Sequence, residues 1–254
     1  MRRVPIGAVV LVVAMIGLFI VTNWGVWFGG QAPAKVIAID AAEPFAGTPA
    51  ADWADGEAGV VIPPVEAIGG HTAAEVADAY QRARAVVLAA MLDPTVIMGV
   101  DSEPYLRLFA PGDRADLRAA LSDPERVNGF LVRFEPGTTL LPRPPKVRGR
   151  MWAESAGAGK LLVRTRFVVA YPLHTDSGPR VEVARLDTDL TIVGKGGPAA
   201  DRGVWLSRAE GSRSSTECDG AHSRGALAGT GSGVLPDALF DPDRPIEAAS
   251  PCGG

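Results

Sequence analysis

Cysteine and histidine are scarce in this chain, and cations do not outnumber acids. The 254 residues include two cysteines and three histidines, and the formal net charge is −4. No C-x-x-C or Cys/His spacing surrounds either cysteine, which disfavours a metal site. A chain of this charge is also a poor general nucleic-acid binder, because that function needs many phosphate-neutralising cations. We therefore expect no metal, no cofactor and no nucleic-acid partner.

Familiar catalytic motifs are missing as well. The sequence has no G-x-x-x-x-G-K-[ST], H-E-x-x-H or G-x-S-x-G pattern. The glycine-rich run 229–233 neither follows a predicted strand nor opens a predicted helix, so it is not a phosphate-binding loop. His71, His174 and His222 fall at turns or in the tail without a recognisable nucleophile or carboxylate spacing, and we expect them at the surface. No catalytic residue is assigned, and we expect a protein that is not an enzyme.

A long apolar run is present at the amino terminus. Residues 4–22 carry no charge, and a helix of that length would span roughly 29 Å, about one bilayer core. Arg2 and Arg3 precede the run, which by the positive-inside rule places the amino terminus in the cytoplasm and the remainder outside. We favour a retained single-pass anchor, because the run exceeds the usual signal-peptide core. The alternative is a signal peptide cleaved at the Ala32 and Ala34 pair.

Composition divides the rest of the chain. Between residues 36 and 70 there are acids but no bases, together with many alanines and prolines, which is typical of an extended, self-repelling linker. Trp53 and the apolar residues 60–62 are exceptions that can dock on the domain. The predicted parts are a membrane anchor (1–30), an acidic Ala/Pro-rich linker (31–70), an extracytoplasmic α+β domain (71–218) and a Gly/Ser/Pro-rich tail (219–254).

Hydrophobic periodicity predicts helices first and strands afterwards. Thr72 and Glu75 form a T-x-x-E capping box that opens a long amphipathic helix over 72–91. Two shorter helices are predicted over 102–110 and 113–121. After residue 128 the period changes to two, and the loop 155–159 is typical of an antiparallel hairpin. The predicted strands are 130–134, 147–154, 160–173, 181–193 and 204–209.

This order of elements predicts an α+β fold: an N-terminal transmembrane helix, then three helices packed on a curved, mostly antiparallel sheet of four or five strands. Over residues 72–210 it resembles the NTF2-like (SnoaL-like) cone, and the periplasmic VirB8-type and single-pass actinobacterial membrane proteins that share it. The helix 72–91, the strand residues 163–169 and the residues 204–206 carry the resemblance. It implies a fold and no catalytic residue.

Cys218 and Cys252 both fall in the exported part of the chain, where oxidation is expected. We expect them to form a disulfide, which would remove about 4 kcal/mol of unfolded-state freedom. Two free thiols or an intermolecular bond are the alternatives.

The strongest charge bias lies between residues 143 and 166. If the loop 155–159 sets the register, Glu154 lies opposite Lys160, and two arginine pairs, Arg150 with Arg164 and Arg148 with Arg166, share one sheet face. Asp187 and Asp189 on the next strand are the expected neutralising partners. Against the single acid Glu154 the region has seven cations: Arg143, Lys146, Arg148, Arg150, Lys160, Arg164 and Arg166.

Two interpretations of this face stay open. One is a solvated ladder of salt bridges, each contributing little stability. The other is an anion-binding or partner-binding surface formed by Arg148, Arg150, Arg164 and Arg166.

The sequence therefore favours a membrane-anchored extracytoplasmic protein that acts as a protein-interaction or assembly module of the cell envelope. Its predicted partners are the lipid bilayer, through residues 4–22, and another envelope protein. The alternative is an NTF2-like domain that binds or transforms a small molecule. A closed pocket with convergent polar groups between helices and sheet would favour that alternative, whereas an interior filled by apolar side chains would reject it.

Overall fold

The computed structural model describes residues 39–124, 126–176, 178–215, 226–227 and 237–246. All of them belong to the second of two compact units, Ile37–Gly254. The predicted transmembrane segment, Cys218, Cys252 and His222 lie outside the described residues.

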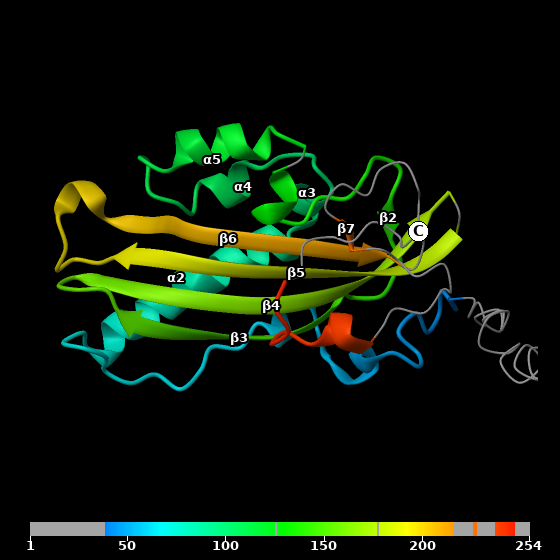
Figure 1. Cartoon of the computed structure of the whole chain (residues 1–254), viewed down its shortest axis with the longest axis horizontal. Coiled ribbons are helices and arrows are strands. Elements are labelled where there is room, and N and C mark those ends of the chain that lie inside the picture. Colours follow the sequence, from blue (N-terminus) through cyan, green and yellow to red (C-terminus); the bar gives the residue numbers. More distant parts are fainter. Residues whose placement is uncertain (1–38, 125, 177, 216–225, 228–236, 247–254) are drawn as a thin grey trace, which may run out of the picture. The chain divides into compact units, whose positions relative to one another are not determined.

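A mostly antiparallel sheet forms the body of this unit (Figure 1). The strand order in the described residues is β1-β3-β4-β5-β6-β7, and β2 pairs with β4. All pairs are antiparallel except that of β6 with β7. The strands are β1 (Ala54–Asp55), β2 (Thr139–Leu140), β3 (Lys146–Ser155), β4 (Lys160–Thr175), β5 (Gly178–Val193), β6 (Gly203–Ser215) and β7 (Ala226–Leu227).

One long helix and three short ones accompany the sheet. They are α2 (Ala73–Met91), α3 (Pro94–Ile97), α4 (Glu103–Leu106) and α5 (Arg114–Leu121). The predicted capping box is confirmed: Glu75 N donates to Thr72 Oγ1 at 3.3 Å, and Thr72 N donates to Glu75 Oε2 at 2.8 Å. Single 3-10 turns are η1 (Pro49–Asp52), η2 (Gly56–Gly59), η3 (Val127–Gly129), η4 (Ala199–Asp201) and η5 (Asp237–Phe240).

The helices cover one face of the sheet, here called the inner face. Figure 1 shows α2 running behind the long strands and α4 and α5 beside β6. Along β4, Leu161, Val163 and Phe167 are buried in the main core with α2, whereas Arg164 and Arg166 between them point to the opposite, outer face. Strand alternation therefore sorts apolar side chains to the helices and arginines to the outer face.

One half of the outer face is covered by two other segments of the chain. Phe45 and Trp53, from the described part of the predicted linker, pack with Phe240 of η5 over apolar residues of β4 and β5. The rings of Trp53 and Phe240 meet edge to face with centroids 5.8 Å apart. The described part of residues 31–70 thus lies against the domain, and Trp53 docks there, because burying its aromatic surface outweighs the repulsion among nearby acids.

The predicted fold class is wrong. In place of three helices on four or five strands, the NTF2-like arrangement, the described residues form four helices and a seven-stranded sheet. The predicted N-terminal transmembrane helix gains no support, since no helix within the described ranges is long and apolar enough to cross a bilayer.

Two local patterns misled the prediction. Asp93 and Pro94 end α2 as expected, but Asp93 Oδ1 also accepts a bond from Thr95 N at 2.8 Å and thereby caps the extra helix α3. Residues 130–134 are not a strand, because Val132 N and Phe134 N donate to carbonyls at the ends of α2 and α3, at 2.9 and 2.8 Å. An alternation of apolar residues indicates that one side of a segment is buried. It does not indicate which backbone groups accept the hydrogen bonds of that segment.

Candidate binding surface on the outer face of the sheet

The uncovered half of the outer face, here called the open half, carries a cluster of charged side chains around one tryptophan. The long strands β3 to β6 each contribute to a hollow of 310 Å³ there. Its lining residues are Trp152, Arg164, Thr165, Arg166, Asp187, Asp189 and Arg208.

The structure places the four predicted arginines on this face but in a different register. Arg150 pairs with Arg166, and Arg148 with Val168, so the register is shifted by two residues from the prediction. The cause is the turn, where Ala156 N donates to Lys160 O and the strand ladder continues to Ser155. A shift of two residues leaves every side chain on the same face, which is why the expected grouping survives.

Asp187 and Asp189 of β5 lie directly opposite the arginines of β4. Arg164 Nε lies 3.7 Å from Asp189 Oδ2, and Arg166 Nε lies 3.6 Å from Asp187 Oδ2. Arg164 NH1 also donates to Glu154 Oε1 at 2.7 Å. The arginines of the open half are thus partly neutralised by their own sheet.

Asp187 is held more tightly by a second arginine, Arg185, two residues earlier on β5. Arg185 Nε and NH2 donate to the two carboxylate oxygens of Asp187 at 2.9 and 2.8 Å. Both residues are buried, with 7% and 6% of their surfaces exposed. Because a bidentate pair out of water is strong and directional, Arg185 is the main partner of Asp187, and the contact of Asp187 with Arg166 is longer.

Trp152 lies between the two arginines that face each other across β3 and β4. The guanidinium carbons of Arg150 and Arg166 are 5.5 and 5.4 Å from its ring centroid. Like charges directly opposite on neighbouring strands repel, and a tryptophan ring offsets this by cation–π attraction. The charge pattern of the sequence did not indicate a role for Trp152. The available signal was that this large aromatic residue alternates in step with the arginines of the same strand.

Cations along β3 and the preceding loop bind acidic segments from elsewhere in the chain. Arg143 NH2 lies 3.4 Å from Glu43, Lys146 Nζ lies 2.9 Å from Asp55, and Arg150 NH2 lies 2.7 Å from Asp243. Arg148, by contrast, is exposed and has no acid within 4 Å among the described residues.

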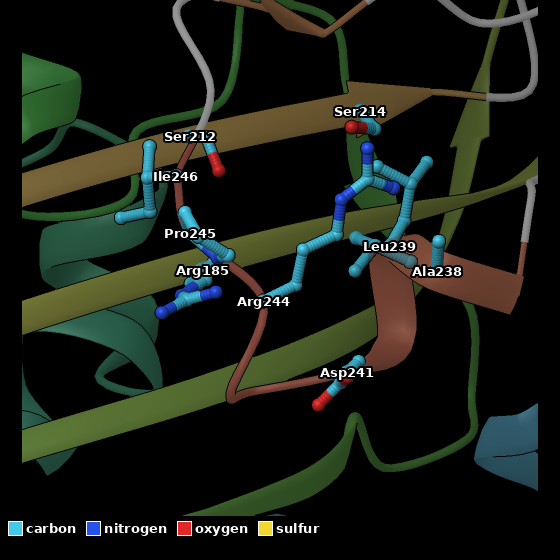
Figure 2. A pocket seen from close by; sticks show the side chains of 10 residues that line it. Arg185, Ser212, Ser214, Ala238, Leu239, Asp241, Arg244, Pro245 and Ile246 are labelled. Carbon is cyan, nitrogen blue, oxygen red and sulfur yellow. The ribbon is translucent and has the colours of Figure 1, made fainter.

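The segment that supplies Asp243 crosses the outer face beside the open half. A small cavity of 70 Å³ lies between residues 238–246 and the strands β5 and β6, and Figure 2 shows its lining, including Arg185, Ser212 and Ser214. The prediction assigned this segment to the tail. Leu239 and Phe240, two apolar residues in an otherwise polar stretch, were the overlooked signal for docking.

The two histidines among the described residues, His71 and His174, do not lie together. His71, expected at the surface, is buried because it closes the amino-terminal end of α2 onto the β3–β4 turn, with Nε2 3.2 Å from Gly157 O. His174 is exposed. In the described ranges no group of three or more His, Cys, Asp or Glu side chains is arranged to hold a metal ion.

A separate buried charge cluster lies on the inner face at the other end of the long strands. Glu182 Oε1 accepts a bond from Arg213 Nε at 2.5 Å, and the guanidinium of Arg213 lies over the ring of Phe134. Next to this pair, Tyr171 OH donates to Met91 O at 2.7 Å, and burial raises the pKa of the Tyr171 hydroxyl well above its usual value. These contacts connect β5 to β6 and β4 to the end of α2, so the cluster stabilises the fold.

The interior between helices and sheet is filled by apolar and aromatic side chains. Phe109, Tyr105, Phe167 and Leu190 are each almost completely buried there. A half-open groove of 570 Å³ is found at the amino-terminal end of α2. A closed cone pocket is therefore not supported by the packing of the main core.

No protein-family model matches the chain, and the comparisons with curated proteins and with solved structures likewise found no match.

Proposed function

We propose that this domain is a protein-interaction module of the cell envelope that binds an acidic segment of a partner protein on the open half of its outer face. The observation that carries the proposal is that the same face already binds acidic segments of its own chain, through Lys146 and Arg150. The open half continues this chemistry, and its hollow is lined by residues of the four long strands β3 to β6 alone.

The arginines of the open half retain hydrogen-bonding capacity. A guanidinium carries five N–H donors, yet among the described residues Arg166 makes one long ion pair and a cation–π contact with Trp152, and Arg148 makes no ion pair. Planar guanidinium groups bind carboxylates bidentately. A partner segment with Asp or Glu residues would therefore find matched donors.

Trp152 supplies the apolar part of the surface. It is half-buried and reaches the hollow together with Arg164 and Arg166. Tryptophan and arginine are enriched among the residues that dominate binding energy at protein interfaces. We therefore expect the acidic partner segment to carry an apolar side chain that contacts this ring, as Phe240 accompanies Asp243 in the chain's own segment.

The test compares matched double variants of the full chain. Arg148→Ser with Arg166→Ser, the two arginines that keep the most donors, is expected to weaken binding of a synthetic peptide containing several Asp residues and one Phe by tenfold or more, roughly 1.4 kcal/mol. Arg107→Ser with Arg118→Ser, two exposed arginines of the helical side, is the control and leaves binding unchanged. Added salt is expected to weaken the interaction, because the contacts are exposed.

The same variants are then expressed in cells and crosslinked in isolated envelopes. The open-half variant is expected to lose a co-purifying protein that the control retains. The proposal would be refuted by equal recovery of the co-purifying protein with both variants. A peptide affinity that stays the same in added salt and in the open-half variant would also refute it.

We also propose that the module works outside the cytoplasm, exported by the apolar run 4–22 with Arg2 and Arg3 before it. Fractionation of a carboxy-terminally tagged chain separates a membrane-retained from a released protein. Alkylation of Cys218 and Cys252 without reductant reports their oxidation state. A tagged chain recovered in cytosol with both thiols reactive would contradict the export proposal.

A further inference from the structure

The half-open groove at the amino-terminal end of α2 lies apart from the open half of the outer face. It is bounded by the first turns of α2 on one side and, on the other, by the start of β4, the end of β5 and the loop before β6. Its volume of 570 Å³ falls within the range of about 300–1,000 Å³ that is typical of small-ligand sites.

Close backbone contacts hold the groove open in a defined shape. The β3–β4 turn and the β5–β6 loop touch at glycines: a Cβ at Gly159, whose φ is +70°, would lie 2.2 Å from Gly197 N. Gly194 N also donates to Gly159 O at 3.0 Å. His71 attaches the start of α2 to the same turn through Gly157 O. All three boundaries of the groove are therefore connected to one another, so the site is preorganised.

The floor and the two walls differ in chemistry. Leu161, Ile192 and Ala79 are buried apolar side chains at the floor. The α2 wall carries Glu75 and Asp78 together with one cation, Arg82, and the facing loop carries Lys195 and Arg202. The groove thus combines an apolar base with walls of opposite net charge.

The charged groups on both walls keep unused hydrogen-bonding capacity. Glu75 uses Oε2 in the capping box and Asp78 uses Oδ2 on Arg82, at 2.7 Å, so the second oxygen of each carboxylate accepts no bond within the described residues. Arg202 NH2 donates to Lys195 O at 3.1 Å, but neither cation has an acid within 4 Å in the described part of the chain.

We propose that this groove binds a short apolar peptide of two or three residues with free termini. The ammonium group would lie at Glu75 and Asp78, the carboxylate at Lys195 and Arg202, and the side chains on Leu161 and Ile192. A lone anion would leave the carboxylate wall unused and repelled, and a lone cation would leave the basic wall unused. An uncharged apolar molecule would gain nothing from the exposed charges of either wall.

The experiment uses the full chain and three probes, measured by calorimetry or ligand-observed NMR. Tri-leucine is expected to bind, and both its N-acetylated form and its C-terminal amide are expected to bind at least tenfold more weakly. Each blocked form keeps the apolar side chains and lacks one charge, so the two losses report the two walls separately.

Matched variants assign each charge to a wall. Lys195→Ala with Arg202→Ala is expected to weaken tri-leucine binding at least tenfold and to abolish the preference for tri-leucine over its amide. Asp78→Asn is expected to reduce the preference over the acetylated form. Arg107→Ala and Trp152→Ala serve as controls and leave all three affinities unchanged, which separates this site from the outer face.

Several outcomes would overturn the proposal. They are no binding of tri-leucine at millimolar concentration, equal binding of the free and blocked forms, and unchanged discrimination in the Lys195→Ala, Arg202→Ala variant. Preferred binding of the acetylated form would identify an amphipathic anion site and would overturn it as well.

Discussion

Asp187→Asn tests whether the buried ion pair beneath the open half stabilises the sheet. The substitution keeps the shape of the side chain but leaves Arg185, 7% exposed, without its bidentate counter-charge, and also removes the acid 3.6 Å from Arg166. Removing one partner of a buried pair costs about 3 kcal/mol, because the other charge stays buried and uncompensated. At a urea dependence of about 2 kcal/mol per molar, the unfolding midpoint is expected to fall by about 1.5 M.

Asp189→Asn is the matched control on the same strand and face. Its side chain is 23% exposed and its ion pair with Arg164 is 3.7 Å long, so the expected cost stays below about 1 kcal/mol. Adding Arg185→Met to Asp187→Asn removes the uncompensated charge and is expected to recover part of the loss. Urea unfolding followed by circular dichroism measures all three variants. Equal midpoint shifts for Asp187→Asn and Asp189→Asn would refute the reasoning.

Three further predictions concern the framework that positions the two surfaces. Phe167→Ala deletes a fully buried ring between β4 and the helices and is expected to cost about 4 kcal/mol in urea unfolding; a cost below about 1 kcal/mol would contradict the described core. Thr72→Ala removes the helix cap of α2 and is expected to cost about 1 kcal/mol, whereas Thr72→Ser retains most of the stability; equal losses for both would show that the cap contributes nothing. Tyr171→Phe loses one buried hydrogen bond, about 1 kcal/mol at neutral pH. The pKa of Tyr171 is higher in the folded than in the unfolded state, where it is about 10, so the protein loses stability as the pH rises above 10. The Phe variant lacks this hydroxyl, and its free energy of unfolding is therefore expected to depend less steeply on pH above 10.

The outer face of the sheet is divided into two halves of different chemistry. Its apolar half is closed by the chain's own segments through Trp53 and Phe240, and its charged half remains open around Trp152. The acidic residues of the closing segments bind to basic residues at the boundary between the halves, as Asp243 does with Arg150. A partner segment that resembled residues 237–246 would therefore extend a contact type that the fold already uses.

Local patterns in the sequence were sufficient for several features of this domain. The capping box of α2 and the alternation along β4 depend on neighbours three or two residues apart, and both are found in the structure. The grouping of Arg148, Arg150, Arg164 and Arg166 on one face follows from the same period of two and survives an error in register.

Only the tertiary structure decided the register, the covering of the outer face and the groove at α2. Each depends on contacts between segments far apart in the sequence: Trp53 with Phe240, Arg150 with Asp243, and Gly159 with Gly197. Composition made residues 31–70 resemble a solvated linker, because their charge is visible in the sequence while the apolar cluster that receives Phe45 and Trp53 is not. Periodicity reports which side of an element is buried, and the partner that buries it is determined by the packing of the whole chain.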